Sequence, residues 1–498
     1  MMNDQDKRKF YLLEALHKGC SNGDAYVMDD MLFPLCKEMN KPLTAKGFHE
    51  DLSKAIHKGT LYREGRRIYD HSTWRYEESA AKDLSTIMQH PGFPLVELPD
   101  PLMVGDIALC DEQRDAVAVA LSHRLTLILG GAGCGKSTLI RAICDHVKGG
   151  KVLCAPTGKA ARNLTARTGL AARTVHSALG LAPNDDFLSP VEWNYTKLVI
   201  VDEVSMLSLD MLAGILHRAN DNCRIVLLGD NNQLLSVGIG NVIPDLLALG
   251  VPTVRLEMNH RQSGSSEGLL KNVVSFASLG RAEDLVWDES FVLHVTHDQA
   301  ALDILIEDAV QLYLAGENIQ VLAPYNQIVA ELNKAIQEKV NPRTDGKKVI
   351  VTRCQEFRDG DRVLITKNSR DYNCSNGDVG VLHILDASRD QPVYYVELPD
   401  GRKPEWHSYS GTYYMALAYA LTVHKSQGSE YNTVLMPISM SMYRMLSRNL
   451  FYTAISRGKS KVILYGDSQA VDVAMQKSLP QRKSMLVAKT HMRMRNCA

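Results

Sequence analysis

The sequence lacks any long hydrophobic run: no apolar stretch approaches the roughly 18 residues that a membrane-spanning helix needs. Its first residues, MMNDQDKRKFYLLEALHKG, also lack the apolar segment and small-residue cleavage site of a secretion signal. We therefore expect a cytoplasmic protein with no membrane partner.

Paired cysteines are also missing. The ten cysteines include no C-x-x-C pair and no cluster with histidine. This scatter is typical of reduced thiols in cores and loops, so the sequence predicts neither a zinc or iron–sulfur site nor a disulfide framework.

Excess charge of either sign is absent, because 56 basic residues balance 57 acidic ones and leave a net charge of −1. The overall field therefore does not attract phosphates, and any nucleic-acid site must be a local groove. The end of the chain is different, since no acidic residue follows Asp472. This basic end predicts either a solvated tail or a phosphate contact. Its basic residues include Lys477, Arg482, Lys483, Lys489, Arg493 and Arg495.

The length of 498 residues exceeds what one core can hold and indicates about three or four domains. Residues 1–100 read as short helices followed by GTLYREGRRIYD, which alternates like a hairpin around Glu64 and Gly65. This pattern predicts a small winged-helix-like module. Such a module can bind DNA, bind a protein or simply pack on its neighbour.

The rest of the chain is α/β in character. Apolar strands such as LTLIL, KVLCA, KLVIV and RIVLL alternate with helical segments, and NIQVLAP, NTVLMP and KVILYG repeat the arrangement later. This pattern predicts two parallel sheets covered by helices, with the functional site at the carboxyl ends of their strands. Alternating strands around the Asn376–Gly377 turn predict a β-barrel inserted in the second domain. The predicted domains are 1–100, 101–257, 258–342 with 415–498, and the barrel 343–414.

A phosphate-binding loop is predicted by GGAGCGKST, which follows the strand LTLIL and precedes an apolar helix. Glycines let backbone N–H groups approach phosphate oxygens, Lys136 reaches the β- and γ-phosphates, and Ser137 ligates Mg²⁺. The predicted ATP contacts in this loop are Gly130, Gly131, Ala132, Gly133, Cys134, Gly135, Lys136, Ser137 and Thr138.

Two carboxylates follow the apolar strand in KLVIVDEVSML. A carboxylate pair there is costly unless it faces a metal ion or a solvent cleft, so we expect Asp202 at Mg²⁺ and Glu203 orienting a water molecule. Upstream, the amide of Gln113 in DEQRDAV can make the paired hydrogen bonds that distinguish adenine.

Further polar residues suit ATP hydrolysis. Gln233 in LLGDNNQLLSVGIGN can contact a γ-phosphate and report its loss. Arg261 in EMNHRQ and Arg457 in NLFYTAISRGKSKVILYG can act as arginine fingers that stabilise transition-state charge.

In this order the stretches resemble the motifs of superfamily 1 helicases, specifically the RecD-like, B-type branch, over residues 105–490. APTGKAARNL and YALTVHKSQGSEY resemble two further motifs of that family. The resemblance implies two RecA-like domains, an SH3-like barrel, ATP with Mg²⁺ in the interdomain cleft, and 5′→3′ movement on single-stranded DNA. It also directs Gly428 and Glu430 towards the nucleotide.

The DNA contacts that we expect lie on the other side of the cleft. Hydroxyl, ring and cationic side chains there suit a phosphate backbone, which a motor indifferent to sequence should grip. His176 and Tyr325 can equally well be packing residues. The predicted set is Pro156, Thr157, Lys159, His176, Tyr325, Thr422, His424 and Lys425.

The chain departs from the family in two places. Leu235 stands where proline is usual, and only the short segment 181–193 is available as a strand-separating pin, with Phe187 and Trp193 as candidate wedges. The leading interpretation is an ATP-dependent DNA helicase that acts on single-stranded DNA and on single-strand/double-strand junctions, in recombination, repair or replication. The alternatives are a translocase or RNA-directed motor without efficient unwinding, and an ATP-controlled clamp. The N-terminal module is the predicted contact for replication or recombination proteins.

Overall fold

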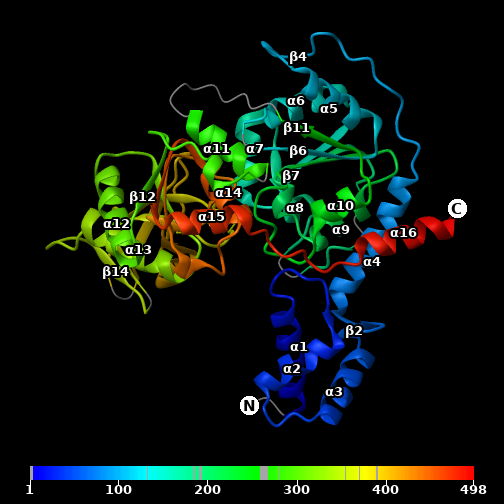
Figure 1. Ribbon diagram of the computed structural model, residues 1–498, viewed down its shortest axis with the longest axis horizontal. Coiled ribbons are helices and arrows are strands. Elements are labelled where there is room, and N and C mark those ends of the chain that lie inside the picture. The colour runs from blue at the N-terminus through cyan, green and yellow to red at the C-terminus, as the bar shows by residue number, and fades with distance from the viewer. Residues whose placement is uncertain are drawn as a thin grey trace.

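The computed structural model describes residues 4–131, 133–182, 185–189, 193–257, 267–278, 280–353, 355–369, 371–388 and 391–497. Two α/β domains lie side by side, and the N-terminal module extends below the first of them (Figure 1). Among the described helices, none combines the length and apolar character required to cross a bilayer.

The first α/β domain contains a six-stranded parallel sheet in the order β11-β6-β10-β9-β7-β8. Leucine, isoleucine and valine dominate its central strands, which are buried because helices cover both faces. The strands are β6 (Leu125–Gly130), β7 (Gly150–Ala155), β8 (Ala172–Thr174), β9 (Thr196–Val201), β10 (Arg224–Gly229) and β11 (Thr253–Leu256). The helices are α5 (Asp111–Ser122), α6 (Lys136–His146), α7 (Gly158–Thr168), α8 (Val175–Ala178), α9 (Leu209–Arg218) and α10 (Val242–Ala248).

The second α/β domain has a five-stranded parallel sheet in the order β12-β23-β22-β13-β21. Its strands are β12 (Phe291–Val295), β13 (Ile319–Ala323), β21 (Ala420–Thr422), β22 (Tyr431–Ile438) and β23 (Gly458–Gly466). Its helices are α11 (Glu267–Ala277), α12 (Asp298–Leu314), α13 (Asn326–Val340), α14 (Arg448–Ile455) and α15 (Ser468–Gln476).

The inserted barrel is antiparallel, with the hairpin β14-β15 and a sheet in the order β19-β18-β17-β16-β20. Together with the two parallel sheets it confirms the predicted fold class, two RecA-like domains with an SH3-like insert in the second. The barrel strands are β14 (Val349–Val351), β15 (Glu356–Arg358), β16 (Arg362–Ile365), β17 (Val379–Asp386), β18 (Val393–Glu397), β19 (Glu405–Trp406) and β20 (Met415–Leu417).

One predicted boundary is wrong. Residues 415–417 were expected in the second α/β domain, but β20 pairs with β16 and completes the barrel sheet. The chain enters the parallel sheet only at β21, whose Ala420 to Thr422 pair with Val321 to Ala323 of β13. Residues 415–422 therefore form two short strands, one in each sheet.

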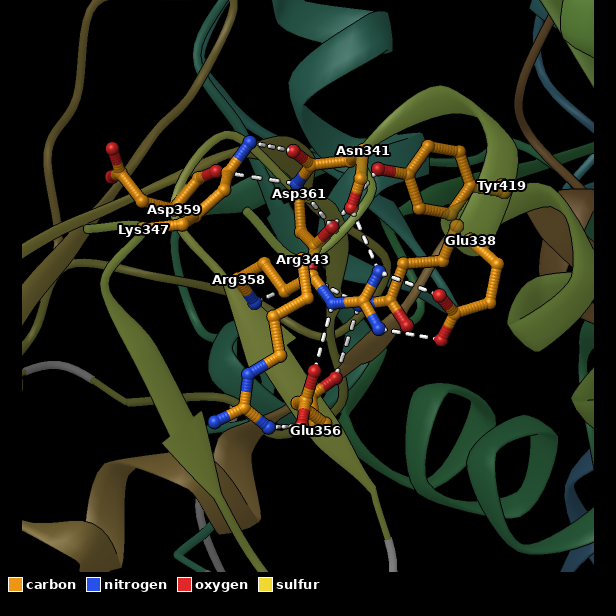
Figure 2. A network of polar contacts seen from close by, with 10 residues as sticks. Glu338, Asn341, Arg343, Lys347, Glu356, Arg358, Asp359, Asp361 and Tyr419 are labelled. Atoms are coloured by element: carbon orange, nitrogen blue, oxygen red, sulfur yellow. Dashed lines mark hydrogen bonds and ion pairs between the residues drawn. The ribbon is translucent and has the colours of Figure 1, made fainter. Parts of the chain in front are cut away.

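A buried polar network fixes the barrel to α13 (Figure 2). Arg358 donates hydrogen bonds to the Asn341 carbonyl oxygen (2.8 Å), to Glu338 Oε1 (2.5 Å) and to Glu356 Oε1 (2.8 Å). Asp361 is fully buried and accepts hydrogen bonds from Asn341 Nδ2 (2.7 Å), Gln337 Nε2 (2.6 Å) and the Tyr419 hydroxyl (3.0 Å). Because these groups come from α13 and from both ends of the insert, the barrel and the second α/β domain form one unit.

The N-terminal module contains the predicted helices and hairpin. Its helices are α1 (Asp4–Gly19), α2 (Asp29–Met39) and α3 (Ala45–His57), and its sheet has the order β1 (Val27–Met28), β3 (Arg67–Asp70) and β2 (Leu61–Glu64). The boundary at residue 100 is wrong, however, because α4 (His71–Met88) packs on α9 and contributes to the core of the first α/β domain.

The C-terminal segment corrects a third boundary. Residues after α15 leave the second α/β domain, cross below the first, and end in α16 (Leu486–Cys497), which packs on α4 (Figure 1). Neither interpretation of the basic tail holds for Arg482 and Lys489. Arg482 donates to backbone carbonyl oxygens, and Lys489 is buried against glutamates.

Candidate nucleotide and DNA site

The phosphate-binding loop connects β6 to α6. Gly133 (φ 90°) and Gly135 (φ 75°) adopt left-handed conformations that residues with a Cβ rarely take. Lys136 Nζ donates hydrogen bonds to the carbonyl oxygens of Gly130 and, at 2.9 Å, Gly131, so the ammonium is folded over the loop. Of the other predicted contacts, Cys134 is buried, Ser137 and Thr138 lie in the first turn of α6, and Ala132 lies outside the described residues.

The two carboxylates follow β9 at the cavity that the loop borders. Removal from water and the adjacent Glu203 raise the pKa of Asp202 to about 6. Glu203 has a φ of 56°, a left-handed conformation that is uncommon outside glycine and costs free energy. Burial and the neighbouring Glu203 therefore disfavour the charged form of the Asp202 carboxyl group, and a cation bound beside it would offset this effect.

Gln233, in the segment after β10, lines the same cavity as Asp202 and Glu203. Its side chain is buried, and its amide nitrogen lies 3.4 Å from Asp230 Oδ2. Among the described residues its Oε1 has no hydrogen-bond partner. A buried acceptor without a partner, at the wall of the cavity, is poised for a donor that enters with a ligand.

Arg457 approaches the cavity from the second α/β domain. It is buried, and its guanidinium donates to the carbonyl oxygens of Thr453 (3.0 Å) and Ser429 (3.3 Å). The other predicted finger, Arg261, lies outside the described residues.

Gln113 does not point freely towards a base in this structure. Its Nε2 donates to the Cys134 carbonyl oxygen at 3.2 Å, and its Oε1 accepts from Cys110 N at 3.2 Å. The amide therefore connects the start of α5 to the phosphate-binding loop.

A cavity of about 300 Å³ brings these groups together between the two α/β domains. Gly428 and Glu430 also line it. The Gly428 carbonyl oxygen accepts from Asn163, and Glu430 pairs with Arg167 at 3.1 Å. Its lining also includes Gly131, Gly133, Cys134, Gly135, Lys136, Ser137, Asp202, Glu203, Gln233 and Arg457.

Sequence reasoning missed Asn163 and Arg167, although the signal was present. With Lys159 they recur every fourth residue, so they share one face of α7. Thr157 caps this helix by accepting from Ala160 N at 3.2 Å, and Gly169 (φ 71°) ends it.

Tyr452 of α14 was also missed. Its buried hydroxyl donates to Asp230 Oδ2 at 2.6 Å across the domain boundary. Nearby, Leu234 N donates to Thr453 Oγ1 at 2.8 Å. The segment after β10 is therefore held by α14 of the opposite domain.

The DNA candidates form two groups at strand ends. In the first α/β domain, Pro156 is buried and Thr157 caps α7, while His176 is exposed with its ring 5.1 Å from that of Phe187. Burial, then Arg362, Arg162 and Arg457 in decreasing order, lower the pKa of Lys159 to about 8.

The second group belongs to the second α/β domain. Thr422 is buried and accepts from Lys425 N at 3.3 Å, and Lys425 itself is exposed. Tyr325 caps α13 just beyond Ala323, which pairs with Thr422. Burial, followed by the charge of Arg482, lowers the pKa of His424.

The candidate pin, 181–193, falls partly outside the described residues. Phe187 is buried and packs edge-on against Tyr76 and His176. Trp193 packs on the same core. In this structure neither ring is presented as a wedge, so this expectation is wrong for the described part of the segment.

Arg482 clamps the 234–241 loop that follows Gln233. Its guanidinium donates to the carbonyl oxygens of Ser236 (2.6 Å), Gly238 (2.9 Å) and Gly240 (2.9 Å). A Cβ at Gly23 (φ 88°) would collide with this guanidinium, and Gly240 N donates to the Gly23 carbonyl oxygen at 2.9 Å. The tail, the loop and the N-terminal module therefore meet at Arg482.

Replacing Arg482 by lysine should lower the maximal ATPase rate on the order of tenfold. A single ammonium group cannot make all three hydrogen bonds of the guanidinium, so the loop that follows Gln233 would be held less firmly. The Michaelis constant for ATP should change little, since Arg482 does not line the nucleotide cavity. Steady-state kinetics at varied ATP test this. Lys483→Gln is the control, because Lys483 lies next to it but is half exposed and 3.8 Å from Asp24. An Arg482→Lys variant as active as this control would contradict the expectation.

Three family models match the chain. They are an AAA domain over residues 108–296, the SH3 domain of ATP-dependent RecD-like DNA helicases over 332–396, and a UvrD-like helicase C-terminal domain over 417–465. The AAA match covers the first α/β domain and continues through α11 and β12 of the second. The SH3 match begins within α13 and extends into the barrel, and the UvrD-like match contains β21, β22 and most of β23.

Curated relatives agree with these matches. The chain is 32% identical over 444 residues to the ATP-dependent RecD2 DNA helicase of Deinococcus radiodurans, covering 84% of this chain and 58% of that protein. It is 29% identical over 476 residues to the RecBCD enzyme subunit RecD of Mycolicibacterium smegmatis, covering 83% and 80% respectively. The chain thus spans less than two thirds of the Deinococcus protein and most of the Mycolicibacterium one.

A solved structure shares the fold. The crystal structure of Pif1 helicase from Bacteroides in complex with ADP-AlF3 and single-stranded DNA aligns with a TM-score of 0.50 and 16% identity. The alignment covers 78% of this chain and 98% of that one. At this identity the likeness concerns the architecture.

Proposed function

Because the chain belongs to the RecD-like branch of the superfamily 1 helicases, we propose that it is an ATP-dependent DNA helicase that moves 5′→3′ on single-stranded DNA. One observation carries the proposal: Lys136 from one α/β domain and Arg457 from the other line the same cavity. Closing that cavity on ATP and opening it after hydrolysis would change the spacing of the two domains, which is what directed movement requires.

Each group at the cavity has a role in hydrolysis. Lys136 leaves the loop carbonyls and binds the terminal phosphates, and Arg457 approaches the γ-phosphate when the domains close. Glu203 and the free Oε1 of Gln233 orient the attacking water. Ser137 and Asp202 would hold Mg²⁺, which neutralises phosphate charge when bound. The raised pKa of Asp202, due first to burial and then to Glu203, fits a carboxylate that a bound cation would stabilise.

The two DNA groups would grip the backbone of one strand. Lys159 and Thr157 belong to the first α/β domain, and His424 and Lys425 to the second, so a change in domain spacing alters the distance between the grips. The Deinococcus relative is named as a DNA helicase, and the Bacteroides structure contains single-stranded DNA. Both support DNA as the track. We also propose single-strand/double-strand junctions as substrates, a cytoplasmic location, and replication or recombination proteins as partners of the N-terminal module.

Unwinding of matched duplexes that carry either a 5′ or a 3′ single-stranded tail tests the proposal. We expect unwinding with the 5′ tail only, together with strong stimulation of ATP hydrolysis by single-stranded DNA. Preference for the 3′ tail would refute the polarity. Stimulated hydrolysis without strand separation would indicate a translocase, and a requirement for the 2′-hydroxyl would indicate an RNA-directed motor.

A further inference from the structure

A loop of the barrel covers the start of α7, where the predicted DNA contacts Thr157 and Lys159 lie. A Cβ built on Gly158 would come within 2.7 Å of Ser375 Cβ, and one built on Gly377 would lie 3.6 Å from Lys159 Cβ. The 375–378 loop therefore packs on α7 without intervening space. This contact joins the barrel to the first α/β domain.

Asp378 is the last residue of this loop, and its carboxylate lies at the contact between the barrel and α7. Its carboxylate forms an ion pair with Arg162 of α7 and lies 3.2 Å from Nη2 of Arg402 in the barrel. The Asp378 side chain is only 6% exposed, so this is a buried pairing and not a surface one. Ser375 N also donates to Asp378 Oδ2 at 2.9 Å, which orients the carboxylate towards the two arginines.

The surroundings of Asp378 carry more positive than negative charge. Lys159 lies one turn before Arg162 on α7, and Arg362 and Arg162 are among the charges that lower its pKa. Asp378 is paired with two guanidinium groups at once, whereas the only other carboxylate paired with Arg402 among the described residues, Asp400, is 46% exposed. Guanidinium groups bind carboxylate and phosphate through the same forked hydrogen bonds.

We propose that Arg162, Arg402 and Lys159 form a phosphate-binding site for the DNA backbone, and that Asp378 occupies this site until a phosphate of the strand displaces it. The proposal rests on the proposed function and adds to it a site shared by the first α/β domain and the barrel. Displacement releases the 375–378 loop from α7. Because the α13 network makes the barrel one unit with the second α/β domain, the release removes one of the contacts between the two α/β domains and leaves those at Asp230 and Glu430 in place.

Fluorescence anisotropy of a labelled oligo(dT), with the full chain and no nucleotide, tests the site. Asp378→Asn removes the competing charge at nearly constant shape, so we expect binding about tenfold tighter than for the unchanged protein, the usual effect of one charge-assisted hydrogen bond. In an Arg162→Gln background the same change should lose most of its effect, because a guanidinium that it would free is missing.

Asp400→Asn is the matched control. It changes the net charge by the same amount beside the same Arg402, but the Asp400 carboxylate acts on Arg162 only from a distance and forms no direct ion pair with it, so its removal should tighten binding less. Equal gains for the two variants, or a gain for Asp378→Asn that persists without Arg162, would overturn the proposal. Oligo(dT) that does not bind the unchanged protein would instead contradict the proposed function.

Ser375→Val is a second test of whether the 375–378 loop restricts the site. It leaves the charge unchanged and can be used if Asp378→Asn does not fold. The Ser375 side chain packs on Gly158 so closely that a Cβ there would come within 2.7 Å of Ser375 Cβ, and the bulkier valine side chain should therefore push the loop off α7. We expect tighter oligo(dT) binding in this variant too. Unchanged affinity in a folded Ser375→Val protein would show that the loop does not restrict the site.

Discussion

Lys136→Ala should reduce ATP turnover at least about 10³-fold, with or without DNA, because it removes a cation that contacts the transferring phosphate group. Among the residues that the structure describes, Lys136 Nζ donates hydrogen bonds to the loop carbonyl oxygens of Gly130 and Gly131 alone. Those bonds can be exchanged for phosphate oxygens without any rearrangement of the loop. Alanine is a good helix former, so α6 should still begin at this position. Radiometric or coupled-enzyme ATPase measurements give the rate.

Lys148→Ala provides the control for this loss. Lys148 is exposed shortly after the end of α6 and lies outside the cavity, so its removal changes the charge of the same domain without touching the nucleotide. Circular dichroism and thermal unfolding should be similar for both variants and the unchanged protein. Turnover by Lys136→Ala within tenfold of the control would contradict the role assigned to this lysine.

Much of the two α/β domains was predictable because their signals are local. Strands such as LTLIL are buried on both faces, so every position is apolar, and this pattern marks them without knowledge of the fold. The phosphate-binding loop is equally local, since its glycines, Lys136 and Ser137 lie within one strand–loop–helix unit. The structure places these groups at one cavity with Asp202, Gln233 and Arg457, as the order of the motifs led us to expect.

The contacts between domains could not be predicted in the same way. Arg162 and Asp378 are 216 residues apart, and nothing in either neighbourhood indicates the other. The division of Met415–Leu417 and Ala420–Thr422 between two sheets depends on which partner strands are free, which the alternation of residues does not reveal. The exception is α7, where Lys159, Asn163 and Arg167 recur every fourth residue. This spacing places them on one helix face, and in the structure Asn163 and Arg167 on that face contact the second α/β domain.

The partners of the basic C-terminal tail could not be predicted from its sequence either. Its sequence supports a solvated or phosphate-bound end, because acidic partners are absent from the segment itself. The partners of Lys489 are instead Glu64, Glu77 and Glu78, near the opposite end of the chain. A charge pattern within one segment therefore describes its composition, and only the tertiary structure shows which charges neutralise it.

Lys489→Met is expected to destabilise the attachment of α16 by about 3–5 kcal/mol, the usual cost of leaving a buried charge without its partner. Lys489 is 3% exposed and lies 3.1 Å from Glu77, whose side chain is fully buried, and 3.0 Å from Glu78. Its ammonium also lies 5.1 Å from the ring centroid of Tyr69. Methionine fills similar space but leaves the Glu77 carboxylate uncompensated, so α16 should separate from α4 at a lower temperature or denaturant concentration.

Hydrogen exchange of α16 and α4 measures this loss directly, without assuming that the multidomain chain unfolds in one step. Glu77→Gln in the same chain should restore most of the protection, since it removes the unpaired charge. Arg493→Met is the matched control: Arg493 pairs with Glu78 at 2.5 Å but is 39% exposed, so its loss should cost at most about 1 kcal/mol. Equal exchange in the Lys489 and Arg493 variants would show that the buried pair does not hold the tail to the N-terminal part of the chain.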